Sequence, residues 1–303
     1  MTAALSRLRH LQQRLPRSDS GRAALWVIVA SGTLTVMAGA ILGPVVNQIQ
    51  AGLGVSQSLA GLIITTHGLF IVVTSPIAGI LIDRYGPRRP YILGLVVYAL
   101  AGGAGLVVTS FPMLLATRAL LGVAVAFVYT GVTVLIYNLY EGDRKDRVMG
   151  LRSGANSLGA SIWPFVGGAL GTVSWQVPFG IYLVGLPLGV LALLFVPEPA
   201  LTSTADDSGG SRQALVNVVT GTPLVVFVYL LYFLANLLLY SITVYYPGYL
   251  AGYGIESSLV ISLYLAGMGI AGGVSAALYD RIHRHLTYRQ LVSVALSLWT
   301  VGF

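Results

Sequence analysis

The chain has 303 residues, of which 56% are hydrophobic and only 9% are charged. A water-soluble domain of this size carries charge on about a quarter of its residues, so this composition excludes an ordinary soluble protein. The net charge of +7 does not indicate nucleic-acid binding, because the basic residues are scattered over short turns between apolar runs, and the absence of cysteine excludes thiolate metal sites.

Nine apolar segments follow one another along the chain. They are residues 25–49, 59–82, 91–108, 113–137, 149–173, 178–196, 223–246 and 259–279, with a ninth segment beginning at Leu291. Each of the first eight is long enough to cross a hydrocarbon core of about 30 Å. Backbone polar groups in lipid must be hydrogen-bonded within their own segment, so these segments are expected to be helices. The sequence therefore predicts an all-α integral membrane protein in the cell membrane.

The basic residues predict the orientation of these helices. With the N-terminus in the cytoplasm, every Lys and Arg except Arg118 falls in a cytoplasmic tail or turn: Arg7, Arg9, Arg14, Arg17, Arg22, Arg84, Arg88, Arg89, Arg144, Lys145, Arg147, Arg152, Arg212, Arg281, Arg284 and Arg289. Such asymmetry is what the positive-inside rule predicts. Residues 1–22 are therefore expected to form a cytoplasmic tail.

A polar stretch at 198–213 divides the chain and indicates a flexible cytoplasmic linker. It separates an expected six-helix bundle, 23–197, from a partial bundle of three helices, 214–303. Residues 51–59 and 251–259 resemble each other and hold the same place in the two parts, which indicates a parallel repeat. By this repeat the ninth helix stops short at Phe303, so the sequence is expected to be either a fragment or a truncated gene product.

The turn after the second segment, Gly79-Ile80-Leu81-Ile82-Asp83-Arg84-Tyr85-Gly86-Pro87-Arg88-Arg89, resembles the signature loop of the major facilitator superfamily, although Pro87 replaces a basic residue. The resemblance implies two six-helix bundles and a conformational latch formed by Gly79, Asp83, Arg84, Gly86, Arg88 and Arg89. From the residues alone, Gly79 permits close helix approach, Gly86 permits a tight reversal, and Asp83 needs a partner at the membrane edge. The alternative is an ordinary positive-inside loop.

Two titratable side chains in the predicted helices, Arg118 and His67, are candidates for coupling. A buried cation is costly and marks a functional site by default, and Arg118-Ala119-Leu120-Leu121-Gly122 resembles a motif whose arginine is linked to proton coupling. The alternative is that Arg118 extends to the interface. His67 is a second coupling candidate, although a lone histidine is more often a packing residue.

The fifth segment carries residues 159–168, which resemble the antiporter motif of the same superfamily, with Trp163 in place of a glycine. The resemblance implies an exporter and assigns helix packing to Gly159, Pro164, Gly167 and Gly168. Proline and small residues would bend this helix and let a neighbour approach closely. Generic glycine-rich packing is the alternative.

The substrate cavity is expected between the bundles. Its candidate residues are Asn47, Tyr129, Thr133, Tyr137, Asn156, Tyr229, Tyr232, Asn236 and Tyr240. Tyrosine suits amphipathic ligands because it joins an apolar ring to one polar group. No acidic residue falls in the middle of a segment, which favours a neutral or anionic substrate over a cation.

The function predicted is a secondary transporter, an exporter of the drug/proton antiporter kind, with the lipid bilayer, a small molecule and protons as partners. One alternative is an importer of a metabolite or organic anion, with Arg118 as the anion site. Another is a non-transporting sensor or a truncated relic. An enzyme is not predicted, because no nucleophile–base pair or metal-ligand cluster adjoins the segments, and no cofactor, metal or nucleic acid is expected.

Overall fold

The computed structural model describes residues 18–199, 223–283 and 285–302. The predicted tail up to residue 17 and most of the predicted linker lie outside the described residues. The regular elements are helices throughout: α2 Ser18–Ala40, η1 Gly43–Val45, α3 Val46–Leu53, α4 Gln57–Tyr85, α5 Arg88–Gly103, η2 Ala104–Leu106, α6 Phe111–Leu139, α7 Gly142–Gly171, η3 Val177–Val184, α8 Gly185–Phe195, α10 Pro223–Gly252, α11 Ser258–His283 and α12 Tyr288–Gly302. The all-α prediction is confirmed.

Helix boundaries differ from the predicted ones most clearly at two places. The first predicted span is interrupted by the 3-10 turn η1, which contains Pro44, and continues as α3. The fifth begins earlier than predicted, at Gly142, because the charged residues before Met149 continue the helix. Seven described helices are long and apolar enough to cross a membrane. Helix α7 is not among the seven because its first turns are charged and it contains small polar residues. Helix α12 is not among them because it has only 15 residues.

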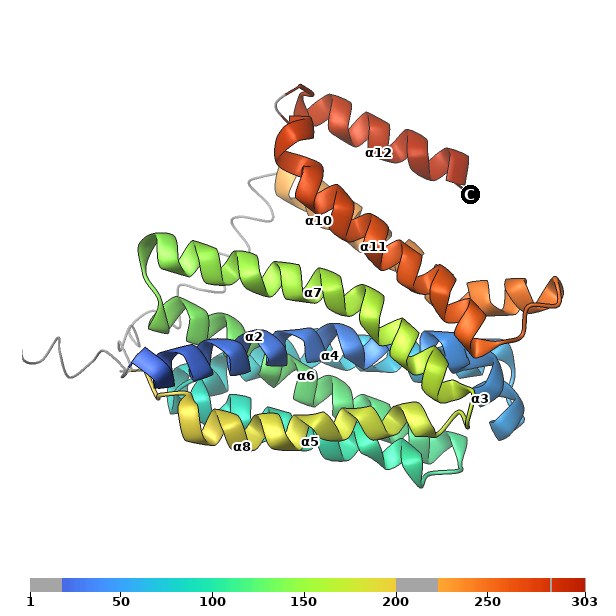
Figure 1. Cartoon of the computed structure of the whole chain (residues 1–303), viewed down its shortest axis with the longest axis horizontal. Coiled ribbons are helices and arrows are strands. Elements are labelled where there is room, and N and C mark those ends of the chain that lie inside the picture. The colour runs from blue at the N-terminus through green and yellow to red at the C-terminus, as the bar shows by residue number, and fades with distance from the viewer. Residues whose placement is uncertain (1–17, 200–222, 284, 303) are drawn as a thin grey trace, which may run out of the picture.

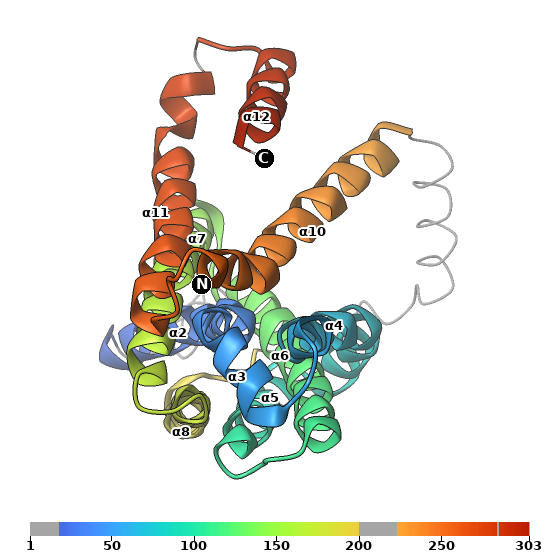
Figure 2. The ribbon, with the colours of Figure 1, turned by 90° about the vertical axis from the view of Figure 1, so that its right-hand side faces the viewer.

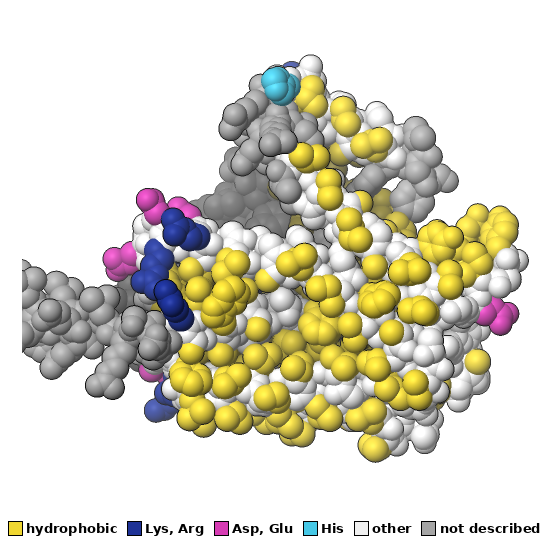
Figure 3. All heavy atoms as spheres, viewed as in Figure 1, with side chains coloured by type: hydrophobic (Ala, Val, Ile, Leu, Met, Phe, Trp, Pro, Cys, Tyr) yellow, Lys and Arg dark blue, Asp and Glu magenta, His cyan; other side chains and the backbone are white. Residues whose placement is uncertain are grey.

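The first helix group comprises α2 to α8 and holds the main hydrophobic core. In this group α6 packs against α4, α5 and α2, while α7 lies along α2. Outward-facing leucine and valine side chains such as Val72, Leu93 and Leu194 remain exposed. Figure 3 shows apolar side chains over the flank of this group and Lys and Arg side chains gathered at one end. An apolar flank with charge confined to the ends is the surface that a bilayer requires.

The second helix group comprises α10, α11 and α12. Its described core is small, formed by Leu250, Ile261 and Leu265. In Figure 2, α10 and α11 meet near the turn that joins them and diverge toward their other ends. The two copies of the repeat share one backbone detail: Gly54 and Gly254 have φ angles of 64° and 79°, a left-handed conformation that favours glycine.

Among the described residues, the two groups approach each other from one end to about the middle of their helices. We call the end that carries Arg84, Arg88, Arg89, Arg144, Lys145 and Arg147 the arginine-rich end, and the end with the turns at 54–56 and 253–257 the opposite end. Figure 1 shows α11 lying against α7 near the opposite end and rising away from it toward the arginine-rich end. The close contacts between α7 and α11 therefore fall on one side of the molecule.

Candidate functional site

Polar contacts join the two groups near the opposite end. The amide Nδ2 of Asn47 donates a 2.8 Å hydrogen bond to the carbonyl oxygen of Pro247, and Ser258 Oγ donates one of 2.9 Å to the carbonyl of Gly168. Asn47 and Pro247 hold the same position in the two repeats, four residues before each Ala-Gly pair. Asn47, predicted to line the cavity, therefore lies in the contact between corresponding points of the two groups.

Glycines and a proline let α7 and α11 approach. A Cβ built on Gly269 of α11 would stand 2.6 Å from the carbonyl carbon of Ala160. Pro164 has no N–H to bond the Ala160 oxygen one turn earlier, so that carbonyl stays open to α11. Gly168 of α7 in turn leaves the room that Ser262 occupies. A larger residue at either glycine would move one helix away from the other.

The predicted packing motif lies in this part of α7. Its four residues are buried: Gly159, Pro164, Gly167 and Gly168. Gly167 faces the carbonyl group of Ile41, and Gly168 faces α11, so the motif contacts both groups. A Cβ on Gly159 would stand 3.1 Å from the indole nitrogen of Trp163. The link between this motif and export stays a prediction.

The predicted latch residues lie in the turn between α4 and α5 at the arginine-rich end. Gly86 has a φ of 81°, and its missing side chain leaves room for the carboxylate of Glu198. Glu198 accepts a 3.3 Å hydrogen bond from the backbone N–H of Arg88, whose guanidinium donates a 2.6 Å bond to the carbonyl of Leu193. Glu198, which is not part of the loop motif, thus links the turn to the chain just after α8.

The structure corrects two expectations for this loop. Among the described residues, no heavy atom lies within 4 Å of a Cβ built on Gly79, because this face of α4 carries exposed Ile80 and Ile77 and no neighbouring helix. Asp83, Arg84 and Arg89 are exposed at the helix end, and the described residues supply no ion pair to Asp83. Whether the loop acts as a latch stays a prediction.

Arg118 is fully buried in α6, which corrects the alternative that it extends to the interface. Its guanidinium carbon lies 4.9 Å from the ring centroids of both Phe179 and Tyr182. Nη2 donates a 3.0 Å hydrogen bond to the carbonyl of Gly102, while Nε and Nη1 have no partner among the described residues. The cation is enclosed by the first group, and its part in proton coupling stays a prediction.

His67 lies where α2, α4 and α10 converge. Its side chain is 1% exposed, and its ring centroid lies 6.4 Å from that of Tyr240 in an edge-on arrangement. Gly39 makes room for the imidazole, since a Cβ there would stand 3.0 Å from Cε1 of His67. The Nδ1 atom has no hydrogen-bond partner in the described part of the chain. His67, a predicted coupling residue, and Tyr240, a predicted cavity residue, thus lie side by side between the two groups.

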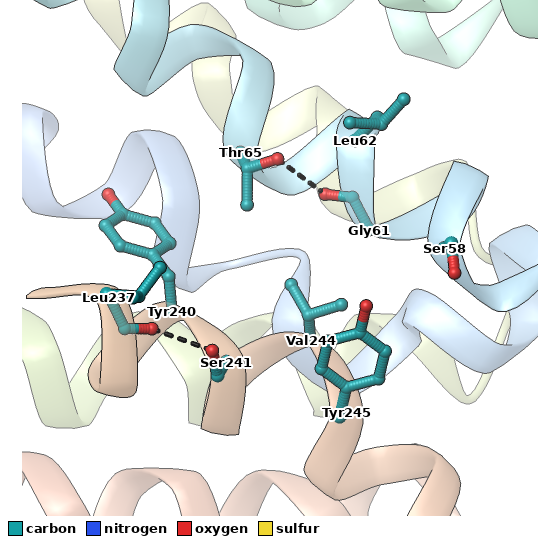
Figure 4. A pocket seen from close by; sticks show the side chains of 9 residues that line it. All are labelled: Ser58, Gly61, Leu62, Thr65, Leu237, Tyr240, Ser241, Val244 and Tyr245. Carbon is teal, nitrogen blue, oxygen red and sulfur yellow. Dashed lines mark hydrogen bonds between the residues drawn. The ribbon is translucent and has the colours of Figure 1, made fainter.

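A pocket of about 170 Å³ lies between α4 and α10 beside this meeting point (Figure 4). Its lining residues are Ser58, Gly61, Leu62, Thr65, Leu237, Tyr240, Ser241, Val244 and Tyr245. Two of its hydroxyls are already bonded within their own helices, Thr65 to the carbonyl of Gly61 and Ser241 to that of Leu237. Of the predicted cavity residues, this pocket contains Tyr240 alone.

A second cluster on α6 and α7 includes an arginine that the sequence placed elsewhere. Arg152, assigned above to a cytoplasmic turn, is 6% exposed inside α7, because that helix begins at Gly142. Its Nη1 donates a 2.8 Å hydrogen bond to Thr133 Oγ1, and its guanidinium carbon lies 4.8 Å from the Tyr129 ring centroid. Asn156 lies one turn further along α7. Three of the predicted cavity residues, Tyr129, Thr133 and Asn156, therefore lie near the cation of Arg152, which was not among the predicted cavity residues.

The remaining candidates are more exposed. Tyr137 lies near the arginine-rich end of α6, with Lys145 Nζ 5.0 Å from its ring centroid. Tyr232 is 70% exposed, and Asn236 donates a 2.8 Å hydrogen bond to the carbonyl of Tyr232 within α10. The side chain of Tyr229 lies outside the described residues.

Comparison with known proteins places the chain in a family. The model of the Major Facilitator Superfamily matches residues 28–303. Multidrug resistance protein 1 of Bacillus subtilis (strain 168) is 25% identical over 260 residues, which cover 85% of this chain and 66% of that protein. The hexuronate transporter of the same strain is 28% identical over 255 residues, covering 78% of this chain and 60% of that protein. The chain thus spans less than two thirds of these relatives.

The fold is also found among solved structures. A bacterial homolog of the human lysosomal transporter Spinster, in an inward-facing and unoccupied conformation, superposes with a TM-score of 0.76 at 17% identity, covering 90% of this chain and 64% of that one. Together with the family match over nearly the whole chain, this agreement of fold assigns the chain to the Major Facilitator Superfamily.

Proposed function

We propose that the chain is part of a secondary transporter, rather than an enzyme, which moves a small molecule across the cell membrane by alternating access. The observation that carries this proposal is that the described contacts between the groups run from the opposite end to the middle of the helices, while α11 separates from α7 toward the arginine-rich end (Figure 1). Asn47 and Ser258 bond between the groups, and Gly269 lets the backbones of α7 and α11 meet. Two rigid groups that separate toward one end can rock about a site between them.

The same proposal fixes the domains and their orientation. The cytoplasmic tail, predicted as residues 1–22, gives way to the first bundle at Ser18, where α2 begins. The first bundle runs to residue 197, residues 198–213 are a cytoplasmic linker, and 214–303 are part of the second bundle. The arginine-rich end faces the cytoplasm, as the positive-inside rule requires. On this proposal, the separation of α11 from α7 at the arginine-rich end belongs to a cytoplasm-facing state (Figure 1).

Export of a small amphipathic molecule in exchange for protons is the direction we propose. The buried glycine–proline motif of α7 and the similarity to a multidrug resistance protein support it. Arg118 and His67 are the candidate coupling residues, and the loop around Gly86 is the candidate latch. A second candidate, a carrier of small organic anions, is supported by the buried cation Arg152 and by the similarity to a hexuronate transporter.

Inside-out membrane vesicles test both candidates. Vesicles with and without the chain are incubated with a defined mixture of neutral, anionic and cationic aromatic compounds, and the accumulated compounds are quantified by mass spectrometry. An exporter accumulates compounds when the vesicle interior is made acidic and loses them when a protonophore is added. An importer instead releases preloaded compounds. Equal accumulation with and without the chain would refute transport.

A further inference from the structure

Arg152 is a buried cation whose neighbours are neutral. Ten residues separate it from the start of α7 at Gly142, about 15 Å along the helix. Its partners are the hydroxyl of Thr133, which accepts a 2.8 Å hydrogen bond, and the ring of Tyr129, 4.8 Å away. A buried charge is costly unless an opposite charge or several hydrogen bonds offset it. One hydroxyl and one ring compensate the guanidinium only in part.

The protein itself supplies no anion at this point in the described structure. The acids nearest in sequence on α7, Asp143 and Asp146, are exposed in its first turns. A guanidinium has five N–H donors, and a single hydrogen bond from Arg152 is found among the described residues. Thr133 already donates its own proton to the carbonyl of Tyr129 at 2.8 Å. The remaining donors of Arg152 are therefore available to a ligand.

Gly32 of α2 packs against this cluster. A Cβ on Gly32 would stand 3.4 Å from Cγ of Arg152 and 3.7 Å from both Nε of Arg152 and Oδ1 of Asn156, all at ordinary contact distance. The Oδ1 of Asn156 is buried and has no partner in the described chain. A cation with free donors and an amide oxygen without a donor thus lie near the same point of α2. That pairing suits a ligand which carries both an anionic group and a hydroxyl or N–H.

We infer that Arg152, Asn156 and Gly32 form a site for the carboxylate of a small organic anion on the transport path. Arg152 donates to the carboxylate, because the planar guanidinium matches its two oxygens. Asn156 accepts from a hydroxyl or N–H next to it, and the half-exposed ring of Tyr129 packs against the apolar part. The inference rests on the proposed transport function and names its substrate class.

This assignment moves the anion site away from Arg118. Arg118 is 0% exposed and held between two aromatic rings and the end of α5, all within the first group. Arg152 also lies within the first group, between α6, α7 and Gly32 of α2, but it adjoins the ring of Tyr129, which is 50% exposed. On this inference a ligand approaches Arg152 from the exposed side of that ring.

Thermal stability of the purified chain in detergent tests the site. The probes are benzoate, salicylate, lactate and glucuronate, each paired with its uncharged amide. We expect at least one carboxylate to stabilise the wild type more than its amide does. Arg152→Gln should weaken that carboxylate about 30-fold or more, and Arg152→Lys should weaken it less. Arg147→Gln removes an exposed arginine from the same helix and should leave binding unchanged.

Gly32→Leu provides a test that keeps the charge. Its side chain would push Arg152 and Asn156 out of their present positions, because a Cβ at Gly32 already contacts both, so carboxylate binding should be lost although Arg152 remains. This variant decides the matter if Arg152→Gln does not fold. The inference is overturned if no carboxylate is distinguished from its amide, or if carboxylates bind equally to the wild type, Arg152→Gln and Gly32→Leu.

The two proposals fail in different ways. If vesicles transport the amides but carboxylates neither bind nor compete, the anion site is wrong and transport stands. If carboxylates bind in an Arg152-dependent manner but vesicles accumulate and release nothing, transport is wrong and the anion site stands.

Discussion

Gly269→Ala should weaken the contact between the two helix groups. The new methyl carbon would stand 2.6 Å from the carbonyl carbon of Ala160 and 2.7 Å from its oxygen, whereas ordinary contacts begin at 3.4 Å. The backbones of α11 and α7 must therefore separate by roughly 1 Å, at an overpacking cost of about 1–3 kcal/mol. Since the contact is made in the conformation of this structure, the cost falls on that conformation.

A cost of about 1–3 kcal/mol lowers the population of one state relative to another by about 5- to 150-fold. The chain has no cysteine, so the pair Gln57→Cys and Gly248→Cys reports on the opposite end without background. These residues belong to different groups, and a Cβ on Gly248 would overlap the side-chain amide of Gln57. The rate of cross-linking by a short bifunctional thiol reagent should fall when Gly269→Ala is added.

Gly267→Ala is the matched control. It lies on the same helix, and no heavy atom is found within 4 Å of a Cβ built there in the described structure. Both changes raise helix propensity by a similar amount, so only the contact with α7 differs. If the two variants cross-link at the same rate, the contact at Gly269 does not hold the groups together and the reasoning is refuted.

Three other predictions concern charge, packing and sidedness. Arg118→Met should leave the melting temperature unchanged or raise it, because removing a partly unpaired buried charge is often neutral. The same variant should abolish proton-driven accumulation in vesicles. A lower melting temperature together with intact transport would contradict this prediction. Gly105→Ala should lower the free energy of chemical unfolding by about 1–3 kcal/mol, since its Cβ would overlap the ring of Phe179. Gly68→Ala is the control, because its Cβ meets no neighbour within 4 Å in the described residues. Equal losses of unfolding free energy in the two variants would argue against the packing of Gly105 on Phe179. Glu256→Cys should react with a membrane-impermeant maleimide in intact cells, and reaction only after lysis would reverse the topology.

The helices and their order could be predicted from the sequence because lipid imposes a simple rule. An apolar run of sufficient length must be a helix, and the predicted segments match α4, α6 and α11 closely. Arg118 could be singled out as a lone cation in an apolar run, and it is buried as that argument requires.

The charge pattern groups Arg152 with Arg144, Lys145 and Arg147, although the predicted segment 149–173 contains it. Its burial depends on the packing of α7 against α6 and α2, which leaves no signal in the local sequence. The hydrogen bond from Asn47 to Pro247 depends on tertiary contact and leaves no local signal.

Distances between spin labels test the central claim most directly, namely that the two groups rock about the contact between them. Two doubly labelled chains in lipid nanodiscs report on the two ends: Gln57 with Gly248 at the opposite end, and Leu151 with Leu278 at the arginine-rich end. We predict a short first distance and a long second one, with Gly269→Ala lengthening the first and shortening the second. A variant in which both distances lengthen together, or neither changes, would contradict alternating access.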